Sequence, residues 1–347
     1  MSSSYTVTNT WSYAKVGHAQ DELNTIKNFL KKFSVEAQIA SLDSEFGDIS
    51  ITSLGVTLHQ MKLDHSRLFK PLVDRQIFRD LSRCVRKAIT QVQSSTSTIV
   101  ITSSRHNHLI RLEKLLIGQY KPRIRILDAP KTSREWEYFA RFVNQAGIEP
   151  IIAMEVKSSV IESIKYLGKV IHVPSHYGLQ RELPSINAAR NRIGIFWPVG
   201  RSFTLRDIEI ILHKSRFLNP IVKLPASVEI DEYRATYPDI TFIPHGTTDS
   251  EFRLYLSQIK IALLMHKNYV RQSSGYAGYF LANDVPVITS KSNSFFTELE
   301  EFGDFHAIED YEENLYEFLV YVDSKPLSKR NEYYHDFSTV AWKSFLL

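Results

Sequence analysis

Cysteine is almost absent from this sequence, because Cys84 is the only one among 347 residues. A single cysteine excludes an intramolecular disulfide and a cysteine-based zinc site within one chain, and it is typical of a reducing compartment. The apolar runs at residues 150–154 and 261–265 are far shorter than the roughly 20 residues that span a bilayer. Residues 1–10 do not have the basic start and apolar core of a signal peptide. We therefore expect a cytoplasmic protein that is neither exported nor membrane-spanning.

Several nucleotide-binding and metal-binding motifs are missing too. There is no GxGxxG, no GxxxxGKS/T, no HExxH and no paired-cysteine spacing, which argues against a dehydrogenase, a P-loop protein and a zinc hydrolase. No DxD pair is present either. A bound pyrophosphate would therefore have to be neutralised by side chains and helix dipoles instead of a carboxylate-held metal ion.

Apolar and aromatic side chains, by contrast, are abundant. They make up 43% and 12% of the residues, which excludes extended disorder. The length of 347 residues exceeds what one hydrophobic core usually organises, so we expect two domains. Residues 1–175 hold 24 Lys and Arg against 16 Asp and Glu, a net charge of +8, whereas the rest holds 18 against 22, a net charge of −4. This asymmetry indicates an anionic partner for the N-terminal half or, alternatively, two domains of different composition.

Short β-rich runs alternate with helical periods along almost the whole chain, which predicts an α/β fold of βαβ units on parallel sheets. A polar stretch with Pro184 at residues 179–191 separates two series of such units, and we place the domain boundary there. The predicted strands are 5–11, 98–102, 123–127, 150–154 and 169–173 in the first series and 193–197, 221–224, 240–243, 260–265 and 285–289 in the second.

Helices are predicted in the gaps between these strands. After a loop through Gly17–His18, an apolar stripe recurs at helical spacing at Leu23, Ile26, Leu30 and Phe33. Another helix begins at Thr132, where Glu135 completes a capping box, and ends at Gly147. The predicted helices of the second series lie near 204–214, 249–258, 272–283, 294–302 and 310–323.

One of these helices begins with residues that suit an anionic ligand. Ser273, Ser274 and Gly275 follow the predicted strand 260–265 and open the next helix. Small residues let the backbone approach a ligand, hydroxyl groups add donors, and the N–H groups of a first helical turn suit a phosphate. The alternative is an ordinary serine N-cap.

The order of features over residues 191–303 resembles the C-terminal domain of GT-B glycosyltransferases. IGIFWPVGRSF resembles the family's first strand and its Gly-Arg pair, here Gly200 and Arg201. TFIPHGTTDSEFRLYLSQIKIALLMH is similar to its strand, turn, helix and strand, with His245–Gly246 at the turn. SSGYAGYFLANDVPVITS resembles the donor-binding helix and the following strand, and HDFSTVAWKSFLL resembles the closing helix.

The resemblance implies two Rossmann-like domains facing each other across a cleft: an acceptor-binding domain at 1–180, a nucleotide-sugar-binding domain at 190–328, and a C-terminal helix at 329–347 that crosses back to the first domain. It implies a metal-independent hexosyltransferase with no cofactor, whose donor is a UDP- or GDP-sugar. Arg201 would neutralise the pyrophosphate, with Arg206 or Lys223 as a second cation; the alternative for each is a solvated surface base. The implied donor-binding residues are Gly200, Arg201, Arg206, Lys223, His245, Gly246, Ser273, Ser274 and Gly275.

The sequence departs from the commonest retaining branch of that family, which carries two glutamates eight positions apart. Alignment on Pro286–Val287 places Arg271 and Tyr279 at those positions, so the resemblance implies either another branch or lost activity. The anomeric outcome does not follow from the motif. We expect transfer to a cell-surface or lipid-linked glycan, as in polysaccharide biosynthesis. The alternatives are a glycosyltransferase acting on nucleic acid or protein, a nucleotide-sugar epimerase, and a non-catalytic binding partner of the same fold.

Three histidines of the first half are candidate catalytic residues. His18 is expected in the loop after the first strand, at the carboxyl edge where α/β folds place ligands. In inverting GT-B enzymes a histidine in a similar loop accepts the proton of the acceptor hydroxyl; a helix-capping or surface histidine is the alternative. His106 and His108 follow the predicted strand 98–102 at the same edge, where related retaining enzymes have a cleft histidine, and would contact the sugar.

The segment 72–91 predicts a basic amphipathic helix with an apolar face and an arginine face. An arginine face can contact an anionic membrane or follow phosphates, and the alternative is a solvated helix. We expect an anionic acceptor, first a lipid-phosphate-linked glycan at the inner face of the membrane. Nucleic acid is less favoured, because stacking aromatics are not interleaved with the basic residues. The arginines are Arg75, Arg79, Arg83 and Arg86.

Overall fold

The chain divides into two compact units. Unit 1 comprises Met1–His176 together with Val340–Leu347, and unit 2 comprises Tyr177–Thr339. Each contains one parallel sheet and helices, which confirms the expected α/β fold. The computed structural model describes residues 4–9, 18–41, 49–50, 97–105, 123–128, 134, 137, 151–154, 170–180, 190–197, 205–225, 228–265, 275–293, 296, 305–311, 317, 320 and 331–347.

The sheet of unit 1 has the strand order β3-β2-β1-β4-β5-β6-β7, and all neighbouring strands are parallel. Strand order therefore proceeds outward in opposite directions from β1 and β4, which is the topological switch point of a doubly wound sheet. The elements are β1 (Ser4–Asn9), α1 (His18–Lys32), β2 (Glu36–Ser41), β3 (Ile49–Ser50), β4 (Ser97–Arg105), β5 (Arg123–Asp128), β6 (Ile151–Met154) and β7 (Val170–His172).

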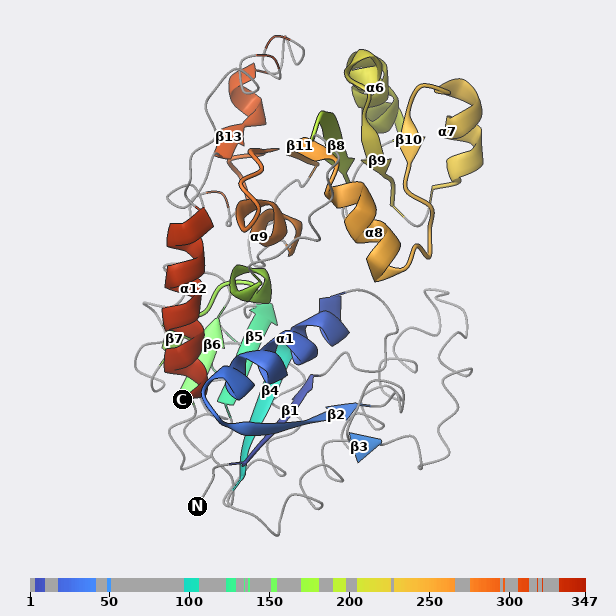
Figure 1. Cartoon of the computed structure of the whole chain (residues 1–347). Coiled ribbons are helices and arrows are strands. Elements are labelled where there is room, and N and C mark those ends of the chain that lie inside the picture. The colour runs from blue at the N-terminus through green and yellow to red at the C-terminus, as the bar shows by residue number, and fades with distance from the viewer. Residues whose placement is uncertain are drawn as a thin grey trace. The chain divides into compact units, whose positions relative to one another are not determined.

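The helix α1 buries the apolar stripe that its sequence spacing predicts. Leu23, Ile26 and Leu30 are buried, and the helix contacts β1 and β2 (Figure 1). Phe33 follows the helix and packs on Phe29 with 5.1 Å between ring centroids. Hydrophobic periodicity at 3.6 residues per turn is thus sufficient to orient this helix on the sheet.

Four expected strands of unit 1 are present as β4, β5, β6 and β7, and the first strand is β1. The sequence pattern did not predict β2 or β3, because β2 (EAQIAS) has few strongly apolar residues and is placed by its pairing with β1. His18 was expected in a loop but is the first residue of α1. Of the helix expected from Thr132 to Gly147, only Arg134 and Glu137 are described, and both are helical; its capping box lies outside the described residues.

Unit 2 repeats this arrangement with the strand order β10-β9-β8-β11-β12-β13, again parallel throughout. The strands are β8 (Arg192–Phe196), β9 (Ile221–Lys223), β10 (Thr241–Phe242), β11 (Ile259–Leu264), β12 (Val287–Thr289) and β13 (Phe305–Ala307). The α-helices described between them are α6 (Leu205–Ser215), α7 (Ile230–Thr236), α8 (Asp249–Leu256) and α9 (Gly275–Leu281).

The first five of these strands and the helices α6, α8 and α9 lie at the expected places. The helix α7 and the strand β13 were not predicted. Of the helices expected at 294–302 and 310–323, Phe296, Glu317 and Val320 are described as helical and most other residues lie outside the described part.

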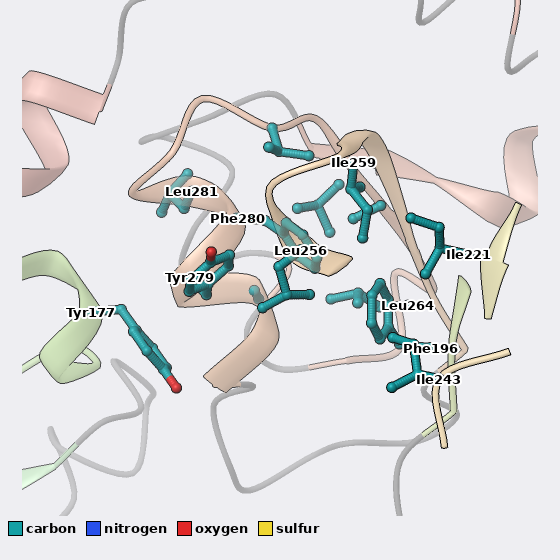
Figure 2. Close-up of a cluster of buried hydrophobic side chains, with 14 of the residues drawn as sticks. Tyr177, Phe196, Ile221, Ile243, Leu256, Ile259, Leu264, Tyr279, Phe280 and Leu281 are labelled. Carbon is teal, nitrogen blue, oxygen red and sulfur yellow. The ribbon is translucent and has the colours of Figure 1, made fainter. Parts of the chain in front are cut away.

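Two apolar cores cover the two faces of the unit 2 sheet. Along β8, Ile193 and Ile195 enter one core and Phe196 enters the other, as the period-two alternation of a strand requires. In the second core, shown in Figure 2, side chains of the strands meet the aromatic and aliphatic residues of α8 and α9. A parallel sheet buried on both faces needs such apolar runs.

The C-terminal helix α12 (Asn331–Leu346) contributes residues to both units. In unit 2, His335 Nδ1 donates a hydrogen bond of 2.6 Å to the carbonyl of Gly178, in the short helix η4 (His176–Leu179). In unit 1, the Tyr5 hydroxyl donates to the carbonyl of Leu346 at 2.8 Å, and Arg123 donates to that of Phe345 at 2.6 Å. Tyr5 of β1 and Arg123 of β5 thereby donate to carbonyl groups at the C-terminal end of α12, which have no partner within the helix.

No helix in the described part of the chain has the length and apolar character needed to cross a membrane.

Gly178 is a position where the fold requires the absence of a side chain. A Cβ added there would lie 2.6 Å from Cβ of Ser338 and 3.1 Å from the ring of Tyr334, so Gly178→Ala should lower the free energy of unfolding by about 1–3 kcal/mol. Urea unfolding followed by circular dichroism measures the loss. Ser338→Gly removes the obstructing side chain and should cost less in the Gly178→Ala background than in the parent. Simple additivity of the two changes would contradict this contact.

Candidate functional site

The carboxyl edge of the unit 2 sheet is where this fold type binds ligands. Strand order reverses between β8 and β11, which pair directly with Phe196 opposite Leu264. Beyond the strands the backbone pairing continues, since Met265 N–H donates to Phe196 and Trp197 N–H donates to Lys223. In open α/β sheets, ligands occupy the crevice outside the carboxyl ends at this switch point.

The sequence-predicted donor residues follow the strands around this switch point, except Arg206, which is on α6. Lys223 ends β9, and His245 and Gly246 are the third and fourth residues after β10. Gly275 is the first residue of α9, the helix after β11. Four others, Gly200, Arg201, Ser273 and Ser274, follow β8 and β11 in the sequence and lie outside the described residues.

Lys223 is a half-buried cation at this edge. Its Nζ donates a hydrogen bond of 2.9 Å to the carbonyl of Pro244 and lies 6.0 Å from the ring centroid of Phe252 on α8. Burial lowers the pKa of Lys223, because a partly desolvated ammonium loses hydration. An anion placed against this ammonium would regain the lost electrostatic stabilisation, and so the group is suited to binding a phosphate.

The turn after β10 is built around the same carbonyl. Thr247 Oγ1 donates to Pro244 O at 2.6 Å, so this oxygen accepts from both Lys223 and Thr247. Gly246 has a φ of 80°, a left-handed conformation that favours glycine. His245 Nε2 donates to the carbonyl of Val228 at 2.9 Å, which ties the turn to the segment before α7. The structure thus joins Lys223 to the turn at 244–247.

Arg206 is the second residue of α6, and its side chain is exposed. Among the described residues, no hydrogen bond or ion pair connects it to Lys223 or to the turn at 244–247. The structure therefore brings together Lys223, His245 and Gly246, and Arg206 takes no part in these contacts.

Sequence reasoning missed a group of aromatic rings at the switch point. Tyr276, in the first turn of α9, lies 5.0 Å from the Phe196 ring at the end of β8 and 5.9 Å from the Phe252 ring. Phe252 is also the ring beneath Lys223. The only sequence signal was the position of Phe196 at a strand end and of Tyr276 beside Gly275, which does not reveal that their rings meet.

In unit 1, the candidate catalytic histidines follow the two strands that flank the switch point. His18 is the first residue of α1, the helix after β1. His106 and His108 follow β4 in the sequence and lie outside the described residues. The same is true of Arg75, Arg79, Arg83 and Arg86, whose contact with an anionic surface stays a prediction.

A buried ion pair holds the beginning of α1. Glu22 Oε1 accepts from Arg125 Nη1 at 2.6 Å, and both side chains are only 1% exposed. Arg125 Nη2 also donates to the carbonyl of Pro174 at 3.1 Å, and the guanidinium lies 5.1 Å from the ring centroid of Trp342 on α12. Asp21 Oδ2 is 3.5 Å from His176 Nε2. These contacts fix the first turns of α1.

The sequence contained a signal for this ion pair. Glu22 precedes Leu23 in the apolar stripe of α1, and Arg125 stands in the middle of the apolar strand RIRIL. Charged residues at positions that a fold buries are normally paired. Periodicity alone does not show which two charges meet, because they are 103 positions apart in the chain.

Comparison with known proteins gives the fold. No family model and no curated protein sequence matches the chain. Sucrose-phosphate synthase from Thermosynechococcus elongatus is similar with a TM-score of 0.61 and 12% identity, over 99% of this chain and 96% of that one. The N-terminal domain of Candida albicans trehalose-6-phosphate phosphatase gives 0.53 and 11%, over 98% and 95%.

A third similar structure is an alpha,alpha-trehalose-phosphate synthase (UDP-forming) from Burkholderia vietnamiensis, with a TM-score of 0.50 and 11% identity over 100% of this chain and 96% of that one. The structural neighbours include GT-B glycosyltransferases, as the sequence resemblance implied. The chain therefore has an α/β fold of the GT-B type. At 11–12% identity the likeness is one of fold.

The buried pair should respond asymmetrically to substitution. Arg125→Met leaves the Glu22 carboxylate buried without its cation and should cost about 3–5 kcal/mol of unfolding free energy. Adding Glu22→Leu should restore much of that loss, because no buried charge then remains. Denaturant unfolding of the two single variants and the double variant completes the cycle. A double variant that is less stable than Arg125→Met would show that the lost stability does not come from the unpaired Glu22 carboxylate.

Proposed function

We propose that this chain is a glycosyltransferase that binds a nucleotide sugar through unit 2 and an acceptor through unit 1. The observation that carries the proposal is the placement of Lys223 and the turn at 244–247 at the carboxyl edge of a sheet with GT-B topology. A similar structure described as UDP-forming supports a UDP-sugar donor. A GDP-sugar is the second donor to test.

Glycosyl transfer makes two demands on the protein. The bond between the anomeric carbon and the β-phosphate oxygen breaks, and the electron pair leaves with the nucleoside diphosphate. The acceptor oxygen bonds to the anomeric carbon and gives its proton to a base. Cations must therefore face the leaving diphosphate, and a group of near-neutral pKa must face the acceptor.

For the diphosphate, the proposal assigns Lys223 and Arg201 as cations, and the hydroxyl and N–H groups of Ser273, Ser274 and Gly275 as further donors. The charge is then neutralised without a metal ion. Gly200 and Gly246 allow close approach of the backbone. His245 keeps its turn in place through Val228, and Arg206 is the weaker second cation because its side chain is exposed on α6.

For the acceptor, the proposal assigns His18 as the base in an inverting reaction, with His106 and His108 as the alternatives in a retaining one. Glu22 stands one turn after His18 in α1 and is fixed by Arg125. Because His18 and Glu22 belong to the same helix, the buried ion pair also fixes the backbone position of His18. A general base must be held in place in this way for proton transfer.

The acceptor proposed first is a glycan on an anionic lipid, which would place a cytoplasmic protein at the inner face of the membrane. The net charge of +8 in residues 1–175 and the arginines at 75, 79, 83 and 86 support this choice. Nucleic acid, a protein acceptor, an epimerase reaction and a non-catalytic role are the outcomes that would replace it.

Nucleotide sugars should raise the melting temperature, because a ligand that binds the folded state stabilises it by about 2.7 kcal/mol at a concentration 100 times its Kd. UDP-glucose and GDP-mannose are the probes. Lys223→Met should reduce the shift, whereas Lys214→Met, which removes an exposed lysine of α6, should leave it unchanged. The absence of a shift with either probe at millimolar concentration would refute the donor site.

The affinity should also depend on pH in a defined direction. Binding of a diphosphate favours charged Lys223, so the pKa is higher in the complex than in the free protein. Affinity should be constant below the lowered pKa of the free protein and fall as pH rises through it, starting below the ordinary value of 10.5. Calorimetric titrations at several pH values measure this fall, which Lys223→Met should abolish.

Replacing His18 by alanine should lower turnover by about 10²–10⁴ while nucleotide affinity stays nearly unchanged, because a general base acts in the transition state. Release of UDP from the donor measures turnover, and the melting shift with donor measures binding. If turnover persists, His18 is not the base. If the product keeps the anomeric configuration of the donor, His106→Ala and His108→Ala become the variants to compare.

A further inference from the structure

Helix α12 carries an apolar stripe on its outer face. Its inner face packs against the rest of the chain, and Tyr334, Ser338, Trp342 and Phe345 on this face are buried. On the outer face Tyr333 is 60% exposed, Val340 68% and Leu347 44%. These three residues are seven positions apart, and Leu347 still donates its N–H to the carbonyl of Lys343, so it continues the helical path. Seven residues are close to two turns, which aligns the three side chains along the helix.

The charges beside this stripe have opposite sign at its two ends. Asp336 is exposed one turn before Val340, and Lys343 and Ser344 are exposed one turn after it. The pattern is nearly the same when it is read in either direction from Val340. Tyr333 and Leu347 are each seven positions away, and Asp336 and Ser344 are each four positions away.

We propose that α12 binds α12 of a second copy of this chain in an antiparallel pair, with a two-fold axis at Val340. In this arrangement each Val340 faces its counterpart, and Tyr333 of each copy faces Leu347 of the other. Asp336 of each copy comes beside Lys343 and Ser344 of the other. Self-complementarity of this kind is what a two-fold interface demands.

Charge decides between this arrangement and its alternatives. A parallel pair would place Asp336 against Asp336 and Lys343 against Lys343, which is repulsive in both places. An anionic lipid surface would gain little, because the one acidic and the one basic residue that the structure describes beside the stripe, Asp336 and Lys343, cancel. Lys343 is exposed, and its Nζ lies 5.0 Å from the ring centroid of Phe33.

The size of the stripe sets the expected strength of the pair. Tyr333 and Leu347 are about 21 Å apart along the helix axis. A pair limited to this face buries less than the roughly 800 Å² per partner of a standard interface. The dimer is therefore weak and forms with rising protein concentration.

Cysteine substitution tests both the pairing and its direction. All variants carry Cys84→Ser, which removes the only native cysteine. Val340→Cys should form a disulfide-linked dimer under mild oxidation, since facing residues of helices 8–10 Å apart have Cα atoms within the disulfide limit. Leu254→Cys on α8, at a residue that is 51% exposed, is the matched control and should give at least several-fold less dimer.

Two further variants distinguish antiparallel from parallel pairing. In the antiparallel pair, Tyr333→Cys alone and Leu347→Cys alone should not cross-link, because each cysteine lies about 21 Å from its own counterpart. An equimolar mixture of the two should give a dimer with one chain of each kind. Cross-linking of each single variant with itself would show a parallel pair and overturn the proposal. Equal yields for Val340→Cys and Leu254→Cys would also overturn it.

Sedimentation velocity tests the pair without cross-linking. The wild-type sedimentation coefficient should rise with concentration, and Val340→Asp, which places two carboxylates at the axis, should raise the dimer Kd at least tenfold. Leu254→Asp should behave as wild type. A wild type that stays monomeric to several hundred micromolar refutes the proposal. If it is monomeric but binds phosphatidylcholine–phosphatidylglycerol vesicles in a manner that Val340→Asp reduces, the stripe is a lipid contact instead.

Discussion

The parallel pairing of strands is the constraint on which the rest of this structure depends. Adjacent parallel strands need a crossover connection, and all their carboxyl ends therefore meet at one edge of the sheet. Because strand order reverses between β1 and β4 and again between β8 and β11, each unit has a switch point at that edge. Lys223 and the turn after β10 are 21 positions apart in the chain and come into contact only for this reason.

Buried polar contacts hold the helices in register with the sheets. Apolar packing fixes which face of α1 is inward but tolerates small shifts, whereas the Arg125–Glu22 pair has one geometry. Trp342 and Pro174 complete the surroundings of the guanidinium, so α1, β5 and α12 are joined at a single side chain. The C-terminal helix is consequently part of the core of unit 1 as well as of unit 2.

The comparison with solved structures separates fold from function. Identity of 11–12% with TM-scores of 0.50–0.61 means that nearly every side chain differs while the arrangement of elements is kept. Such a fold is specified by pattern, since a core accepts many apolar sequences of suitable volume. Activity depends on individual groups at the sheet edge, and so the proposed function rests on Lys223, the turn at 244–247 and His18 rather than on the fold alone.

Hydrophobic periodicity by itself determined the α/β class, most strands and the inward stripe of α1, because these depend on spacing within a few residues. The resemblance to GT-B enzymes supplied the candidate donor residues; of those that the structure describes, Lys223, His245, Gly246 and Gly275 lie at a strand end or after one, and Arg206 lies within α6. Periodicity missed β2, β3, α7 and β13; among these, β2 and β13 are placed by their pairing with β1 and β12.

Only the tertiary structure decided which distant residues meet. Arg125 and Glu22, Lys223 and Pro244, and the rings of Phe196 and Tyr276 come from separate elements. Their contacts depend on strand order and helix position, which no local pattern encodes. The sequence alone thus determined the elements and their apolar faces, whereas the fold decided the partners of the buried charges, because a charge in an apolar run shows that a partner is needed but not where it lies.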